Sequence, residues 1–202
     1  MPLFYELNLL FLHIPKTGGT SVENYFRNNH GFCQDTYHYF NHPKIKEHPR
    51  QHCTYSELED EIENIETYKC FIVVRNPLHR IISEINYLEK VIKIVLEGDT
   101  IDEKIFNILT KTKYGDYENH LIPQYDFFLK KDGTFNDKIH IMYNEKLNED
   151  MIDWGFVNFD QMDFVTGKFS QDYDSLVTLE TKRLVYNFYR KDYETFYKDI
   201  KY

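Results

Sequence analysis

The chain has 202 residues, of which 42% are hydrophobic and 28% charged, a balance that favours a folded protein with a single domain over residues 1–202. Its net charge of −9 argues against general binding to nucleic acid or to an anionic membrane surface. Three cysteines without C-x-x-C spacing argue against a disulfide framework and a zinc site. The apolar start lacks the basic residues of a signal peptide, and no 18-residue apolar run follows. We therefore expect a cytoplasmic protein without a transmembrane segment.

The predicted elements alternate between strands and helices. Residues 7–14 form a near-continuous apolar run that predicts a strand buried on both faces, and residues 22–29 predict a helix that Gly31 ends. A capping-box pattern at Thr54 predicts a helix over residues 55–67, and CFIVV at residues 70–74 predicts a second buried strand.

The second half of the chain continues this alternation. Asn76 and Pro77 begin a helix whose apolar period continues to Val95. The pattern then predicts further helices over residues 101–110, 144–152 and 178–200, and a strand over residues 139–143. The alternation indicates an α/β fold with a mainly parallel central sheet flanked by helices.

The segment HIPKTGGTS, residues 13–21, joins the first predicted strand to the first helix. Such a turn aims backbone N–H groups and the positive end of the helix at one point, which favours a bound anion. Gly18 and Gly19 allow a close backbone approach, and Lys16 adds a mobile positive charge. Hydroxyl donors come from Thr17, Thr20 and Ser21. The lysine precedes the glycines, unlike in the nucleotide-triphosphate loop G-x-x-x-x-G-K-[ST], and an ordinary strand–helix turn is the alternative interpretation.

A second segment, VVRNPLHRIIS at residues 73–83, repeats this arrangement. Arg75 follows the second buried strand, and Ser83 lies about two turns into the next helix. Because ligands of open α/β sheets bind outside the carboxyl ends of the strands, we expect Lys16 and Arg75 to point into one crevice. Arginine suits bidentate phosphate contact, whereas Arg80 is expected to brace the site through an ion pair.

Together the two segments resemble the sulfotransferase family. HIPKTGGTS is similar to the family's 5′-phosphosulfate loop, and residues 75–83 are similar to its 3′-phosphate element. The chain looks most like the carbohydrate subgroup related to the heparan 2-O and chondroitin/dermatan enzymes, in its short microbial or viral form. Weaker matches lie at residues 51–57, 123–124, 143–147 and 184–196. This resemblance implies a P-loop-like three-layer fold.

The resemblance also implies a reaction. The co-substrate would be 3′-phosphoadenosine 5′-phosphosulfate, and its sulfuryl group would pass by in-line displacement to a hydroxyl of a carbohydrate or another acceptor, without a metal. Like phosphoryl transfer, this chemistry asks the protein mainly for positioning and charge stabilisation. Lys16 would stabilise the leaving oxygen, and Arg75 and Ser83 would hold the 3′-phosphate. The residues implied to hold the 5′ end are Lys16, Thr17, Gly18, Gly19, Thr20 and Ser21.

The acceptor hydroxyl needs a general base, and we expect it to be His52. This residue lies two positions before Thr54, where the positive end of the helix would keep the imidazole neutral at pH 7. The resemblance points to the same residue. His38 is the alternative base, and His13 is expected to be structural.

Other residues are weaker candidates for contact with the acceptor. The locally basic stretch at residues 42–52 would either bind an anionic acceptor or form a solvated loop. Gln124 and Glu145 would either touch the acceptor or support the site.

Two other classes of protein fit part of this pattern. A P-loop-like kinase or NTPase shares the strand–loop–helix site, but the chain lacks the G-K-[ST] order and a clear aspartate at a strand end for Mg²⁺. A non-catalytic nucleotide- or glycan-binding module of the same fold is the other alternative. The three classes differ in their ligands: a 3′-phosphorylated nucleotide, Mg²⁺-ATP, or a ligand bound without turnover.

Overall fold

The computed structural model describes residues 3–30, 40–42, 45–111, 119–160 and 172–202, with the backbone alone for Tyr5 and for residues 40–42 and 45–50. The chain forms two compact units. The first contains Met1–Val74 and Glu118–Gln161, and the second contains Arg75–Tyr117 and Met162–Tyr202. Each unit is therefore built from two separate segments of the chain. The expectation of a single domain stays a prediction.

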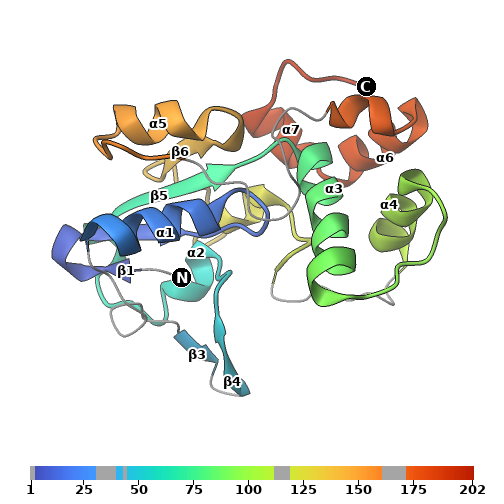
Figure 1. The fold of residues 1–202 in the computed structure, drawn as a ribbon. Coiled ribbons are helices and arrows are strands. Elements are labelled where there is room, and N and C mark those ends of the chain that lie inside the picture. The colour runs from blue at the N-terminus through green and yellow to red at the C-terminus, as the bar shows by residue number, and fades with distance from the viewer. Residues whose placement is uncertain (1–2, 31–39, 43–44, 112–118, 161–171) are drawn as a thin grey trace. The chain divides into compact units, whose positions relative to one another are not determined.

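The first unit contains a four-stranded sheet in the order β1-β2-β5-β6 (Figure 1). Strands β2, β5 and β6 run parallel to one another, and β1 pairs antiparallel with β2. The strands are β1 (Leu3–Phe4), β2 (Leu9–Leu12), β5 (Lys69–Val74) and β6 (His140–Tyr143). This arrangement confirms the mainly parallel sheet and the three strands that the apolar runs predict.

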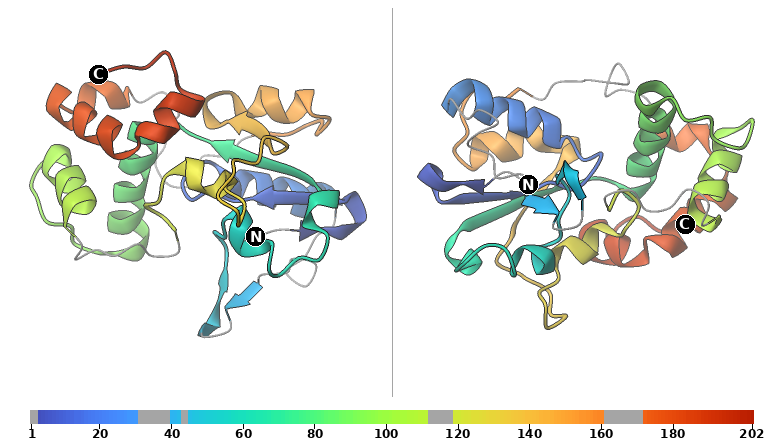
Figure 2. Two further views of the ribbon diagram at one scale, coloured as in Figure 1. Left: turned by 180° about the vertical axis from the view of Figure 1, so that it is seen from behind. Right: turned by 90° about the horizontal axis from the view of Figure 1, so that it is seen from below.

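Helices cover both faces of this sheet. Side chains of α1 (Gly19–His30) and α5 (Leu147–Asp153) form one cluster with the strands, which includes Phe26, Phe71 and Met142. Burial of one such phenylalanine contributes about 1.5–3 kcal/mol, so this cluster holds α1 firmly against the sheet. The right-hand view of Figure 2 shows α2 (Tyr55–Leu58) and the 3-10 helix η6 (Gln124–Phe128) on the other face. The sheet is thus the middle of three layers.

Some elements of the first unit differ from the sequence-based expectation. Helix α2 is a single turn, although the pattern predicts a helix to residue 67, and the chain then passes through turns into η3 (Ile65–Thr67). The sequence from Glu57 to Glu66 is densely acidic, and like charges three or four positions apart destabilise a continued helix. The structure also contains an antiparallel pair, β3 (Phe40–His42) and β4 (Ile45–Arg50), that the pattern does not predict.

The described residues of the second unit form helices. These are α3 (Pro77–Tyr87), the π-helix η4 (Leu88–Ile92), α4 (Ile101–Thr110), η8 (Tyr173–Leu176), α6 (Leu179–Phe188) and α7 (Arg190–Phe196). Asn76 caps α3 as predicted, because its side chain accepts a hydrogen bond from the backbone N–H of Leu78 at 2.9 Å. The single long helix predicted over residues 178–200 is instead two helices. Tyr189 between them has φ −103° and ψ 35°, outside helical geometry, and its ring is buried.

Two short 3-10 helices complete the first unit, η1 (Tyr5–Leu7) and η7 (Asn144–Lys146), the latter directly after β6. In the part of the chain that the structure describes, no helix is both long enough and apolar enough to cross a bilayer.

Candidate active site

The loop from β2 to α1 has an unusual backbone. Lys16 has φ 66° and Gly18 has φ 97°, so two left-handed residues flank Thr17. The left-handed region costs a residue with a side chain roughly 1–2 kcal/mol, and such strain is typical of functional loops. Successive N–H groups in a turn of this kind point inward and form a concave site for an anion. The loop therefore keeps a costly geometry that suits an anionic group.

Two internal hydrogen bonds hold this loop. The Thr17 hydroxyl donates to the carbonyl oxygen of Ile14 at 2.9 Å, and its side chain is fully buried. Asn144, directly after β6, donates through Nδ2 to the carbonyl oxygen of Thr17 at 2.8 Å. The hydroxyl proton and the carbonyl oxygen of Thr17 are thus both used in hydrogen bonds within the protein. Of the other predicted donors, Thr20 is exposed and Ser21 is buried.

Gly19 is required by a side chain of the protein itself. A Cβ at position 19 would lie 2.0 Å from Nε2 of His13, whose ring occupies that space. Gly19 is the first residue of α1, and its conformation is one that alanine also adopts. The glycine therefore makes room for an imidazole against the first turn of α1.

His13 is held in this position by a carboxylate. Its Nδ1 lies 2.8 Å from Oε1 of Glu23 on α1, and both side chains are buried. Burial alone would raise the pKa of Glu23, but the charge of His13 and the hydrogen bond from it outweigh burial and lower that pKa. His13 is therefore part of a buried pair that fixes the start of the loop. This arrangement agrees with the structural role that the sequence suggests for His13.

His52 contacts the same part of the loop. Its Nδ1 lies 2.8 Å from the carbonyl oxygen of His13, and the two rings meet edge to face at 4.7 Å. A carbonyl oxygen only accepts hydrogen bonds, so Nδ1 of His52 must carry the proton. In the neutral imidazole Nε2 then keeps its lone pair, which is the form that a general base needs.

The surroundings of His52 keep it neutral. The pKa of His52 lies well below 6.5, mainly because the ring is buried and also because of the charges of His13 and His120. The hydrogen bond to the backbone of His13 raises this pKa, but by less than the other effects lower it. The His120 ring meets the His52 ring edge to face at 5.0 Å. The capping box predicted at Thr54 is present, but α2 is only one turn long. Burial and neighbouring imidazoles, rather than the helix end, are therefore the main cause of the low pKa.

The backbone of His52 is also held. Asn119 donates through Nδ2 to the carbonyl oxygen of His52 at 2.8 Å and lies 3.2 Å from Oε2 of Glu57. Glu57 in turn accepts from the backbone N–H of Thr54 at 2.8 Å. The segment at residues 119–120 thus supports His52 from two sides, through its backbone and its ring.

Arg75 and Ser83 belong to the second unit. The Arg75 guanidinium lies over the ring of Tyr173, 5.7 Å from its centre, which is a cation–π contact. Ser83 lies on α3 and is 9% exposed. Because Lys16 lies in the first unit, the crevice that it is expected to share with Arg75 stays a prediction. Arg80 is buried with its guanidinium 5.8 Å from the centre of the Tyr189 ring, and its expected ion pair also stays a prediction.

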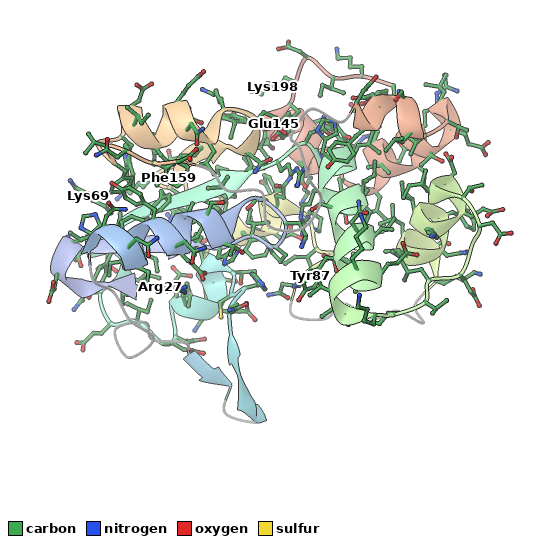
Figure 3. All side chains as sticks on the ribbon, viewed as in Figure 1. Arg27, Lys69, Tyr87, Glu145, Phe159 and Lys198 are labelled. Carbon is green, nitrogen blue, oxygen red and sulfur yellow. The ribbon has the colours of Figure 1, made fainter. Side chains whose placement is uncertain are left out.

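The remaining predicted residues are distributed as follows. Gln124 is fully buried in η6, where it can support the site, and Glu145 is exposed on η7 (Figure 3). His38 lies outside the described residues. Of the basic stretch at residues 42–52, the structure describes the side chains only from Gln51 onward.

Sequence reasoning missed several residues that hold the site. His120 and Asn119 lie in a segment without a periodic pattern, and only their position shortly before Pro123 and Gln124 could have drawn attention to them. Glu23 and Tyr173 have no sequence signal at all, because their partners are distant side chains. Among the described residues, no group of His, Cys, Asp or Glu is arranged to hold a metal ion, and the metal-free reaction stays a prediction.

A mainly parallel sheet with helices on both faces, and a strained loop that joins its strand β2 to helix α1, define an α/β protein of the P-loop-like class. The model of the Sulfotransferase family matches residues 4–198, and the chain therefore belongs to the sulfotransferase family. Membership supports transfer of a sulfuryl group to an acceptor hydroxyl, and it confirms the resemblance that the two motifs predict. The comparisons with curated proteins and with solved structures gave no match.

Proposed function

We propose that this protein transfers the sulfuryl group of 3′-phosphoadenosine 5′-phosphosulfate to a hydroxyl of a carbohydrate, with His52 as general base. Family membership supports the reaction class. The observation that carries the finer proposal is the hydrogen bond from His52 Nδ1 to the carbonyl oxygen of His13. It fixes the candidate base to the first residue of the anion loop and leaves Nε2 as the proton acceptor.

The residues of the loop suit the sulfated end of this donor. Lys16 supplies a cation beside the left-handed turn, and the backbone N–H groups of Thr17, Gly18 and Gly19 supply donors of fixed direction. In the displacement the acceptor oxygen forms a bond to sulfur while the bond from sulfur to the bridging oxygen breaks. The acceptor proton passes to Nε2 of His52, and Lys16 stabilises the negative charge that develops on the leaving phosphate.

Arg75 and Ser83 are proposed to bind the 3′-phosphate, the group that distinguishes this donor from ATP. A guanidinium and a hydroxyl are suitable donors to a phosphate, and the Tyr173 ring beside Arg75 orients the guanidinium. Without contacts to the 3′-phosphate, the protein would not distinguish this sulfate donor from nucleotides such as ATP.

The test is a calorimetric titration with adenosine 3′,5′-bisphosphate, the product of the donor, beside ADP and Mg²⁺-ATP. We expect micromolar binding of the bisphosphate and at least about tenfold weaker binding in Arg75→Ala, because a charge-assisted contact contributes about 1.5–3 kcal/mol. Arg190→Ala is the matched control, because Arg190 is an exposed arginine paired only weakly with Glu194 at 3.5 Å. Preference for Mg²⁺-ATP would contradict the proposal and favour a kinase.

The carbohydrate acceptor rests on the resemblance of residues 51–57, the segment that contains His52, to the carbohydrate subgroup. A screen of mono- and oligosaccharides with radiolabelled donor tests it. Transfer to phenols or tyrosine peptides in preference to every sugar would contradict this part of the proposal and leave the sulfuryl transfer intact.

A further inference from the structure

The first unit contains a cavity of about 590 Å³ at the amino ends of the parallel strands. Leu9, Lys69 and His140 line it, and these are the first residues of β2, β5 and β6. The anion loop follows the carboxyl end of β2. The cavity therefore lies at the opposite edge of the sheet from the candidate active site.

One wall of this cavity is aromatic. The rings of His140 and Trp154 stack in parallel, 4.8 Å apart and at an angle of 2°. The Phe156 ring meets the Trp154 ring edge to face, with ring centres 5.4 Å apart, and the centre of the Tyr25 ring lies 5.9 Å from that of Phe156. Burial lowers the pKa of His140, against the effect of Asp150, so a neutral ring stacks on the indole at pH 7. Such a wall suits a flat ligand, either an aromatic ring or the C–H face of a sugar.

The charged side chains of the cavity are all basic. Lys69 comes from the start of β5, and Lys138 comes from the segment before β6 (Figure 3 labels Lys69). None of the described residues that line the cavity carries a carboxylate, although the chain has 33 acidic residues and a net charge of −9. A cavity that excludes carboxylates in so acidic a protein is suited to an anion.

We propose that this cavity binds a small ring-shaped molecule that carries one sulfate or phosphate ester, with the ring on the aromatic wall and the ester between Lys69 and Lys138. A cavity of about 590 Å³ has the size of sites for small organic ligands. The site is separate from the donor loop and does not depend on the proposed function. The cavity is proposed to bind this molecule without any chemical reaction.

The chain offers a specific probe, because Trp154 is its one tryptophan. Protein labelled with 5-fluorotryptophan gives a single ¹⁹F resonance from the cavity wall. Titration with phenyl sulfate is expected to shift this resonance saturably, with a dissociation constant near or below about 1 mM, as a ligand of this size allows. Phenyl phosphate should behave alike, and the response should persist in Lys16→Ala, which separates this site from the donor loop.

Substitutions distinguish the proposal from weak surface binding. Lys69→Gln and Lys138→Gln are each expected to weaken binding roughly threefold, and the double variant about tenfold, because exposed charge contacts are individually modest. Lys130→Gln is the matched control and should bind as the unchanged protein does. The proposal is overturned if benzyl alcohol or inorganic sulfate binds as tightly as phenyl sulfate, if no shift occurs at millimolar ligand, or if the double variant binds normally.

Discussion

His52 donates its Nδ1 proton to the carbonyl oxygen of His13 across 2.8 Å, and this bond joins two segments that lie 39 positions apart in the chain. It decides which nitrogen of His52 can accept a proton. The rings of the same two residues also meet edge to face, and Glu23 holds the His13 ring through Nδ1. The candidate base is thus fixed by backbone and carboxylate rather than by a surface loop.

The first prediction concerns the role of His52 in turnover. In His52→Asn the side-chain amide can still donate to the carbonyl oxygen of His13, but it has no group in the place of Nε2. We expect kcat to fall by about 10²–10⁴-fold, as for loss of a general base, while binding of adenosine 3′,5′-bisphosphate is unchanged. Steady-state kinetics and calorimetry measure the two quantities. Normal turnover in His52→Asn would remove His52 as the base.

The second prediction follows from the burial of His52. Burial, together with His13 and His120, places the pKa of His52 in the folded protein well below 6.5. Below pH 6.5 the unfolded chain binds a proton that the folded chain does not, so stability is lost as the pH falls. As the pH falls from 7.5 to 5.5, this residue should lower the free energy of unfolding by an amount on the order of 1 kcal/mol.

His52→Asn lacks this titration. Urea unfolding of both proteins at the two pH values should show a larger decrease in the free energy of unfolding for the unchanged protein, again by an amount on the order of 1 kcal/mol. Equal decreases in the two proteins would mean that His52 is protonated in the folded state. The comparison also removes the contributions of Glu23 and other groups, because both proteins share them.

The third prediction tests why residue 19 is glycine. Replacement of a helical glycine by alanine normally stabilises a protein by about 0.5–1 kcal/mol. Gly19→Ala should instead destabilise this protein by roughly 1–3 kcal/mol, because the new Cβ would meet the His13 ring. The effect should vanish or change sign in a His13→Ala background. A double-mutant cycle from thermal or urea unfolding measures it, and equal costs in both backgrounds would contradict the contact.

The fourth prediction separates strain from function at Lys16. Both Lys16→Ala and Lys16→Gly should lower kcat by about 10²–10³-fold, because the cation beside the leaving group is lost. Only glycine relieves the left-handed backbone, so Lys16→Gly should be about 1 kcal/mol more stable than Lys16→Ala. Lys130→Ala is the control for removal of a lysine. If the two Lys16 variants are equally stable, the positive φ carries no strain.

The fifth prediction concerns Tyr173 as a positioning residue for Arg75. Tyr173→Leu removes the ring 5.7 Å from the guanidinium and should weaken binding of adenosine 3′,5′-bisphosphate about two- to fivefold. Tyr173→Phe keeps a ring and should restore most of the affinity. Calorimetry of both variants tests this, since a role confined to the tyrosine hydroxyl would weaken binding equally in Tyr173→Phe and Tyr173→Leu.

Strand and cap positions were readable from local sequence. The apolar runs around Leu10 and Phe71 predict buried strands because both faces of a central parallel strand are covered. Thr54 and Asn76 accept the capping hydrogen bonds that the sequence predicts for them. The lengths of the helices were less predictable, as the one-turn helix α2 shows. The charge repulsion that ends a helix is the sum of many weak pair interactions.

The sequence by itself determined the three parallel strands of the main sheet, the loop that joins the first of them to a helix, and the sulfuryl-transfer class of the reaction, because these depend on neighbouring residues. Only the tertiary structure decided that Gly19 makes room for His13, that Thr17 turns its hydroxyl inward, and that His52 is neutral through burial. The reason is physical. A tautomer, a pKa and a steric limit are set by the groups that surround a side chain, and here those groups come from segments far apart in the sequence.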